Sequence, residues 1–375
     1  MPLSFLARGT LCRCFVAAQN SSTRVGRVCY SADIARKLGV FELHHKLLVN
    51  PVFLMCSERS GSNLIARIFD AHPDFFAPSP AHLFRVFSTL DQNRDLSAEI
   101  LRMFDRKLGI WMLDNQPQAE RAALLAQART SAEKIATLLN AEGRLRNRPR
   151  LFLKENSTHS FLPFIEQVSR NPTYVLMVRD PRDMAVSWVN APTLRGGVLR
   201  SARRWLSDVE GALQADKEGR RIVHLTYESL ISQSEDTLRR VCKELDIEFS
   251  PVMLEHVSNS EGVAQDAGRT ALWQNLSRDI MRDNFNKFQG RLDDNEIAYI
   301  ETLCGPLMAQ FGYAKSRPAD APPFGSEDNF DDLEAALKAR EPWTKPAYQD
   351  LPQDERARLK AWSALKQELD DKYGL

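Results

Sequence analysis

The sequence predicts an α/β fold in three layers, with a central, mostly parallel sheet between helices. Short apolar runs rich in β-branched and aromatic residues recur near 51–56, 151–154, 174–178 and 222–225, as expected of buried strands. Segments with helical spacing separate these runs, which is typical of parallel strands joined by helical crossovers. In such a sheet, ligands bind beyond the carboxyl ends of the strands.

Length, charge and cysteine content narrow the class of protein. The 375 residues suit one large α/β domain with appendages, or two modest domains. A formal net charge of +1 lacks the basic excess of a nucleic-acid-binding domain, so we expect no nucleic-acid partner. No run approaches the roughly 20 apolar residues of a membrane-spanning helix. The six scattered cysteines show no C-x-x-C spacing, so we expect reduced thiols and no metal site.

The junction after the first predicted strand has the composition of an anion site. The apolar run Val52–Cys56 is followed by small polar residues, and helical spacing begins at Asn63. A helix N-terminus offers unpaired N–H groups and a partial positive charge, and Gly61 lets the backbone approach an anion closely. Further side-chain donors are available from Arg59, Ser60, Ser62 and Asn63.

Two common phosphate-binding loops are excluded at this junction. The chain has no G-x-x-x-x-G-K-[ST] segment, so the usual nucleotide triphosphate loop is absent. A tyrosine-phosphatase loop needs an arginine six places after its cysteine, but Ser62 stands six places after Cys56. The alternative interpretation is an ordinary strand–helix turn that happens to carry Arg59 and the serines.

A second strand–turn–helix junction strengthens the anion-site interpretation. The strand Tyr174–Val178 runs into Arg179, and Pro181 suits the first turn of a helix that Asp180 can cap. Ser187 lies about two turns into that helix, where it could join Arg179 around one phosphate.

Together these two motifs resemble the donor-binding motifs of the sulfotransferases. The segment 59–64, ending at Leu64, resembles their 5′-phosphosulfate loop, and 179–188 resembles their 3′-phosphate motif with Arg179 and Ser187. The resemblance covers residues 47–315 and implies the P-loop NTPase-like sulfotransferase fold. It also implies 3′-phosphoadenosine 5′-phosphosulfate (PAPS) as the donor, with no metal.

The resemblance assigns roles to residues further along the chain. Lys154 ends the second predicted strand, where related enzymes aim a lysine at the reacting sulfonate. Tyr227 begins a Tyr-Glu-Ser-Leu segment that is similar to one whose tyrosine lies against the adenine. Trp273 begins a stretch that resembles the donor-covering loop, and Lys287 within it is a candidate phosphate contact.

The general base cannot be transferred from the family pattern. Cytosolic sulfotransferases carry a histidine two residues after the lysine, but Asn156 holds that place here. A histidine has the intrinsic pKa that suits a base near neutral pH. The candidates, in order, are His82, His159, and then Glu58 and Glu155.

Composition divides the chain into three parts. Residues 1–40 form an extension that contains arginines and has no acidic residue before Asp33, and we expect it to be poorly ordered. We expect the protein to be cytoplasmic. The alternative is that this extension is an organelle-targeting segment. The sulfotransferase-like domain spans 41–315 and carries a helical insertion at 85–150 that could roof an acceptor pocket. Residues 316–375 form a linker and a helical tail, which can dock on the core or on a partner subunit in a homodimer.

These observations predict an enzyme that moves a sulfonate from PAPS to a hydroxyl, or as second choice an amine, by in-line displacement. The expected acceptor is a sugar, a lipid or a small metabolite, with Arg59 and Lys154 stabilising the charge that develops during transfer. One alternative is a protein that binds PAPS, or its product 3′-phosphoadenosine 5′-phosphate (PAP), without catalysis. A nucleotide-dependent kinase is the second alternative.

Overall fold

A computed structural model describes residues 46–267, 269, 273, 275, 277–316, 330–340 and 346–374. Its centre is a five-stranded, fully parallel sheet in the order β3-β4-β2-β6-β7. The strands are β2 (Val52–Met55), β3 (Phe75–Phe76), β4 (Arg150–Lys154), β6 (Thr173–Val178) and β7 (Ile222–Thr226). The predicted α/β fold with a parallel sheet is therefore confirmed. The predicted extension 1–40 lies outside the described residues.

All of the predicted strands are present, and the structure adds three two-residue strands that were not predicted: β1 (Leu48–Val49), β3 and β5 (Ser169–Arg170). Strands β1 and β5 form a separate parallel pair. Such short segments carry too few residues to show a period, so sequence patterning does not detect them.

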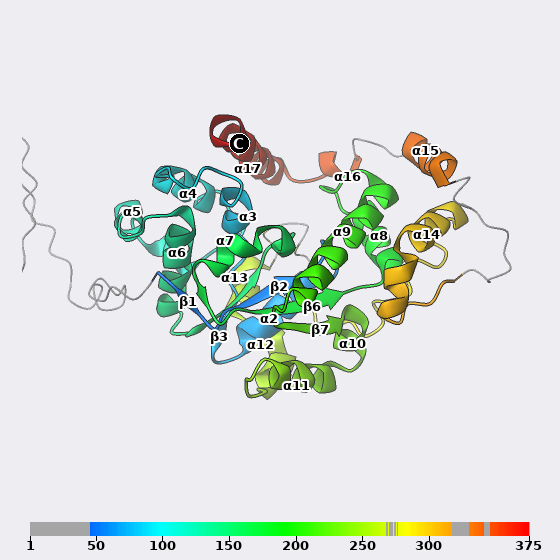
Figure 1. The fold of residues 1–375 in the computed structure, drawn as a ribbon, viewed down its shortest axis with the longest axis horizontal. Coiled ribbons are helices and arrows are strands. Elements are labelled where there is room, and N and C mark those ends of the chain that lie inside the picture. The colour runs from blue at the N-terminus through cyan, green and yellow to red at the C-terminus, as the bar shows by residue number, and fades with distance from the viewer. Residues whose placement is uncertain are drawn as a thin grey trace, which may run out of the picture.

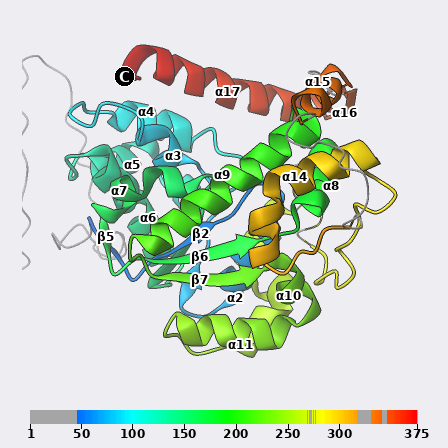
Figure 2. The same cartoon turned by 45° about the vertical axis from the view of Figure 1, so that its right-hand side comes forward.

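Helices cover both faces of the sheet (Figures 1 and 2). On one side, α2 (Ser62–Ala71) packs under the strands, and its Phe69 ring stacks on Phe152 of β4 with centroids 4.2 Å apart. On the other side, α9 (Gly197–Lys217) buries Trp205 in the core. Helices that complete these layers are α7 (Leu162–Glu166), α8 (Pro181–Val189), α10 (Tyr227–Ser232), α11 (Ser234–Glu244), α12 (His256–Asn259) and α13 (Glu261–Asp266).

The expected helical insertion lies between β3 and β4. It consists of α3 (Leu83–Phe87), α4 (Ser97–Phe104), α5 (Gln118–Leu125) and α6 (Ser131–Leu145). Its apolar side chains, among them Ile100, Phe104 and Leu138, are fully buried in the same core cluster as β2 and α9. The insertion therefore belongs to the main domain rather than forming a separate unit.

The C-terminal helices return over the domain. Helix α14 (Asp294–Gln310) packs against α8 and α9, followed by α15 (Phe330–Arg340), α16 (Pro346–Gln349) and α17 (Gln353–Tyr373). Helix α17 lies across α4 and buries Leu365 and Leu369 (Figure 2). Hydrogen bonds from Arg102 to Glu368 and from Tyr373 to Glu99 hold it there. In the part of the chain described, no helix is both long and apolar enough to span a bilayer.

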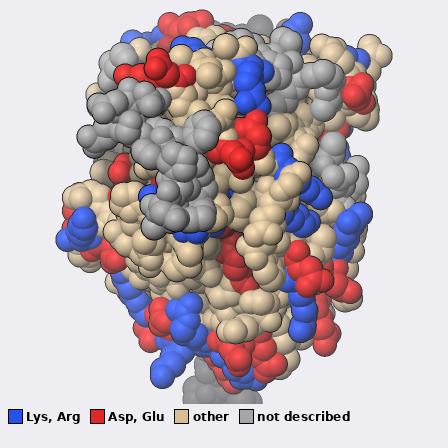
Figure 3. Space-filling view, turned by 90° about the vertical axis from the view of Figure 1, so that its right-hand side faces the viewer, with Lys and Arg blue, Asp and Glu red and all other residues tan. Residues whose placement is uncertain are grey.

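The surface carries both signs of charge. On the face shown in Figure 3, lysine and arginine side chains are interspersed with aspartate and glutamate. This mixture agrees with 50 basic and 49 acidic residues in the whole chain.

Candidate active site

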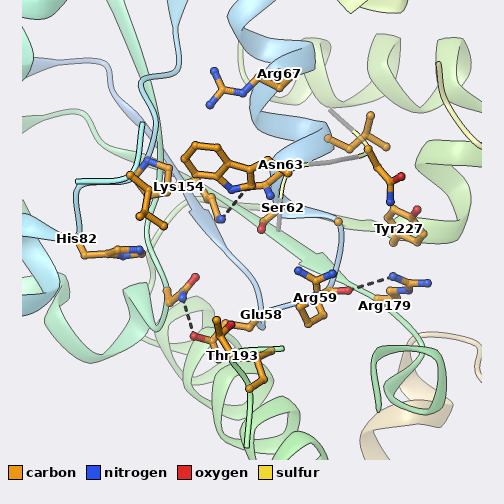
Figure 4. Close-up of a pocket in the computed structure, with 18 of the residues that line it drawn as sticks. Glu58, Arg59, Ser62, Asn63, Arg67, His82, Lys154, Arg179, Thr193 and Tyr227 are labelled. Carbon is orange, nitrogen blue, oxygen red and sulfur yellow. Dashed lines mark hydrogen bonds between the residues drawn. The ribbon is translucent and has the colours of Figure 1, made fainter. Parts of the chain in front are cut away.

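A cavity of about 410 Å³ opens at the carboxyl ends of the central strands. The loop after β2, Lys154 at the end of β4, Arg179 after β6 and Tyr227 after β7 all line it (Figure 4). Because the strands are parallel, their carboxyl ends meet at one edge of the sheet, which brings these distant segments together.

The loop between β2 and α2 has a backbone that few residues can adopt. Arg59 and Gly61 both have positive φ, 68° and 91°, and Gly61 is the N-cap of α2 without a side-chain cap. A Cβ at Gly61 would lie 2.3 Å from a ring carbon of Tyr227, so a larger residue cannot stand there. The bare helix start thus presents backbone N–H groups to the cavity.

Two arginines meet at this loop. Arg179 Nη1 donates to the carbonyl oxygen of Arg59 at 3.1 Å, and Arg59 Nε donates to Ser187 Oγ at 3.1 Å. The Arg179 guanidinium also lies 4.4 Å from the ring centroid of Tyr227. Ser187 therefore reaches Arg59 from α8 and does not line the cavity beside Arg179.

Little negative charge offsets the arginine pair in the described structure, where Glu58 raises the pKa of Arg59 only against larger opposing effects. Among the described residues, neither Arg59 nor Arg179 has a carboxylate within ion-pair distance. Burial lowers the pKa of Arg59, and the positive charge of Arg179 lowers it further. Arg179 Nε is buried with no hydrogen-bond partner in the described structure. A bound anion would supply a carboxylate-like contact to the pair and the acceptor that Arg179 Nε lacks.

Lys154 faces the same cavity from the end of β4. Its Nζ donates to Asn63 Oδ1 at 2.9 Å, which fixes the amine beside the first turn of α2. Burial lowers the pKa of Lys154 to about 8. The amine is therefore poised between its charged and neutral forms in slightly alkaline solution, and a nearby anion would favour the charged form.

Besides Glu58, His82 is the predicted base that lines the cavity. It has a left-handed backbone (φ 54°) just before α3, and its ring extends toward Lys154 (Figure 4). Burial lowers its pKa to about 3, with Lys154 and Arg85 contributing through their charges. The imidazole is therefore neutral at physiological pH but a weaker base than a free histidine, and the negative charge of a bound donor would raise its pKa.

A buried polar network fixes the segment that carries His82. Arg67 of α2 donates to the Ala77 carbonyl at 3.2 Å and to Ser79 Oγ at 3.1 Å, while Ser79 also bonds to Asp266. On the other side of His82, Glu155 accepts the Arg85 N–H at 2.9 Å. Burial raises the pKa of Glu155 to about 7, but this carboxyl does not line the cavity.

Of the remaining predicted residues, His159, Ser60 and Lys287 lie outside the cavity lining. His159 packs against Gly211 of α9, with its Nδ1 3.5 Å from Asp208. The hydroxyl of Ser60 faces Met184 Sδ at 3.7 Å, and Lys287 is not among the lining residues. Glu58 does line the cavity, where its Oε1 accepts from Asn156 Nδ2 at 2.7 Å. The geometry therefore favours His82 over His159 as the base.

Several residues that line the cavity were not predicted from the sequence to belong to the site. Helix α17 contributes Leu359, Trp362 and Ser363, and the Trp362 ring meets the His82 ring edge to face with centroids 5.8 Å apart. Arg85 and Lys107 come from the insertion. The only signal for Trp362 was its place in the helical pattern of the tail, which indicates a buried face but not what that face covers.

Comparison with known proteins identifies the class that this site defines: the chain belongs to the sulfotransferase family, whose model matches residues 51–251. Protein-tyrosine sulfotransferase A of Caenorhabditis elegans is 22% identical over 292 residues, covering 74% of this chain and 70% of that protein. Protein-tyrosine sulfotransferase of Drosophila melanogaster is 23% identical over 313 residues, or 80% and 59% of the two chains.

Solved structures of sulfotransferases also match the chain. The sulfotransferase domain from the curacin biosynthetic pathway has a TM-score of 0.49 at 16% identity, covering 70% of this chain and 98% of that one. Mouse SULT7A1, complexed with PAP, has a TM-score of 0.42 at 14% identity, covering 81% and 93%.

The protein is a sulfotransferase, a member of the class of enzymes that use PAPS as their donor. The residues present fit this molecule, which is anionic at both ends. The loop 59–64 and Lys154 offer donors for the phosphosulfate end, and the unpaired Nε of Arg179 suits an anion near Tyr227. The described residues contain no group of three or more His, Cys, Asp or Glu side chains placed to hold a metal ion.

Proposed function

We propose that the protein transfers the sulfonate of PAPS to a phenolic hydroxyl, with His82 as the base that accepts the phenol proton. The observation that carries the proposal is the position of His82, whose neutral ring shares the cavity with Lys154 and the Arg59 loop. His159 and Glu155 lie outside that cavity lining, and Glu58, which lines it, is held by a hydrogen bond from Asn156 and lies 3.8 Å from Arg204.

Each side chain has a distinct task in this reaction. When bound, the donor supplies a sulfonate whose S–O bond to phosphate breaks as the acceptor oxygen forms a new S–O bond. Arg59 stabilises the negative charge that appears on the departing phosphate oxygen, and Lys154 balances the charge of the sulfonate. His82 takes the proton of the acceptor hydroxyl as that oxygen attacks.

The base strength of His82 favours a phenol over an alcohol. With a pKa of about 3, His82 is a weak base, and transfer to it is least unfavourable from an acidic hydroxyl. A phenol has a pKa of about 10, whereas water and simple alcohols lie near ~16.

The cavity wall and the relatives support the same class of acceptor. The Trp362 ring, which meets the His82 ring in the lining, suits contact with an aromatic ring. Two relatives are named protein-tyrosine sulfotransferases, and a tyrosine side chain is itself a phenol. The sugar, lipid and alkyl hydroxyls expected from the sequence, and an amine, become the less favoured acceptors.

A product assay with matched acceptors tests the proposal. The purified protein is incubated with PAPS and with 4-methylphenol, 4-methylbenzyl alcohol or 4-methylbenzylamine, and sulfated product and PAP are quantified by mass spectrometry. The phenol and the alcohol have similar shape but differ in acidity. We expect the phenol to react at least about tenfold faster than the alcohol. Product from the alcohol or the amine without product from the phenol would overturn the proposal.

A further inference from the structure

A second cavity, of about 370 Å³, adjoins the active site on the side of Glu58 and Thr193. Four residues line both cavities: Glu58, Arg85, Thr193 and Leu194. Its lining is dominated by arginines, which are Arg85, Arg195, Arg200, Arg203 and Arg204. Among the described residues that line it, the one carboxylate is Glu58.

The arginines converge on this cavity from three separate segments. Arg85 comes from α3, Arg195 from the connection between α8 and α9, and the others from α9 itself. On α9, residues three and four apart share one face, so Arg200 lies on the same side of the helix as Arg203 and Arg204. The fold therefore gathers positive charge that the sequence distributes over more than a hundred residues.

Only part of this charge is neutralised within the described structure. Arg203 pairs with Glu334 at 2.5 Å, and Arg204 lies 3.8 Å from Glu58 and 3.4 Å from Asp208. Arg85, Arg195 and Arg200 have no carboxylate within ion-pair distance among the described residues. Arg195, Arg200 and Arg203 are exposed, so solvent screens much of their mutual repulsion, and the guanidinium groups of Arg195 and Arg200 can contact an anion that enters the cavity.

We infer that this second cavity binds an anionic group, a carboxylate or a phosphate, carried by the acceptor. The inference rests on the proposed function, because it places the acceptor hydroxyl near His82 and Arg59. The four shared lining residues give one acceptor access to both cavities at once. Arginine forks match the paired oxygens of carboxylates and phosphates, so Arg195 and Arg200 select acceptors by charge.

The test compares acids with their uncharged amides. The probes are 4-hydroxyphenylacetate, 4-hydroxyphenylpropanoate and 4-hydroxyphenylhexanoate, each beside its amide, so that reach and charge vary separately. Two tyrosine peptides, with glutamate or glutamine beside the tyrosine, distinguish a peptide side chain from a small molecule as the source of the charge. We expect KM for the acid to be at least about tenfold below KM for the amide in one pair or more.

The variant Arg195→Gln/Arg200→Gln links that preference to the cavity. Neither arginine pairs with a carboxylate in the described structure, so the change leaves no buried acid without its partner. We expect the acid-to-amide ratio of KM to approach one. Arg240→Gln on α11, an exposed arginine paired with Glu244, is the matched control and should keep the wild-type ratio.

Binding is measured beside turnover, so that the two proposals fail separately. Dissociation constants of the same probes for the PAP-loaded protein report the cavity even if no phenol is sulfated. A preference for acids that disappears in the double variant supports the inference. The absence of any preference, or a preference that survives in the double variant, would overturn it. Loss of turnover with the binding preference retained would count against the phenol proposal alone.

Discussion

The donor half and the acceptor half of the active site are built in different ways. The donor half uses residues at the carboxyl ends of neighbouring strands: the Arg59 loop after β2, Lys154 on β4, Arg179 after β6 and Tyr227 after β7. The acceptor half uses His82 before α3, the connection to α9, and α17. In the donor half, the position of each residue follows from the strand end or helix start beside it in the sequence. In the acceptor half, the positions follow from how distant helices pack against one another. Variants of the first half should therefore affect every acceptor, and variants of the second should discriminate among them.

Arg59 should produce the largest effect. We expect Arg59→Ala to lower kcat about 100-fold to 1,000-fold, because removal of one preorganised charged donor typically costs that much. Turnover with saturating PAPS and a phenol acceptor is the measurement. Arg59→Lys, which keeps the positive charge, is the matched control and should retain more activity. Turnover of Arg59→Ala within about threefold of wild type would remove Arg59 from the charge-stabilising role.

Substitution of His82 should produce the second-largest effect. The backbone conformation of this residue determines which substitution avoids strain. The residue has φ 54°, a conformation that asparagine tolerates far better than alanine, so His82→Asn removes the base with little strain. We expect kcat to fall by about 100-fold, with PAP affinity by calorimetry within about twofold of wild type.

The acidity of the acceptor sharpens the His82 prediction. A more acidic phenol needs less help from a base, so the loss in His82→Asn should be smaller with 4-nitrophenol than with 4-methylphenol. An equal loss with both phenols would mean that His82 positions the acceptor and does not accept its proton. Unchanged turnover would exclude His82 from both roles.

Lys154 should impose a pH dependence on use of the donor. Its pKa of about 8 means that the free protein loses this charge as pH rises through 8, so kcat/KM for PAPS should fall above that pH by up to about tenfold per unit. His82, with a pKa of about 3, should add no inflection near 6.5. Lys154→Arg should move the alkaline fall to higher pH, because arginine stays charged. An unchanged profile in this variant would contradict the assignment.

The sign of the stability change separates this effect from unfolding. The pKa of Lys154 is lower in the folded protein than the ordinary value of 10.5. Between these two pH values the unfolded chain binds more protons, so the contribution of Lys154 to the free energy of unfolding rises with pH. Activity should therefore fall in a pH range where loss of the proton removes the cost of burying a charged Lys154, which a thermal-unfolding series at the same pH values can verify.

Site residues could be predicted from the sequence where the adjoining strand and helix determine their position in the fold. The loop with Gly61 and the strand-end Arg179 could be located because a buried strand and a helix start flank each of them. The same reasoning placed Ser187 beside Arg179, yet its hydroxyl accepts from Arg59 instead, because side-chain direction within α8 is set by packing. His159 lies only five residues after Lys154, but the turn between them directs it toward α9.

The acceptor half was less predictable because its contacts join segments far apart in the chain. Trp362 meets His82 across 280 residues, and only the docking of α17 on α4 brings the two rings together. Arg85 and Arg200 likewise share a cavity through the packing of separate helices. Local spacing carries no information on such contacts, so the arginine cavity and the contact of Trp362 with His82 became visible only in the folded structure.

Trp362 should give the smallest effect and the one most specific to the acceptor half. The tryptophan lines the cavity beside His82, while Leu365 and Leu369 on the same helix stay buried against the core. We therefore expect Trp362→Ala to keep α17 docked and to raise KM for 4-methylphenol about tenfold, which corresponds to loss of one aromatic contact of about 1.4 kcal/mol. KM for PAPS should stay within about twofold, and Trp362→Phe should restore most of the phenol affinity. A parallel rise in both KM values would mean that α17 supports the whole site, and the separation between donor and acceptor halves would fail at this residue.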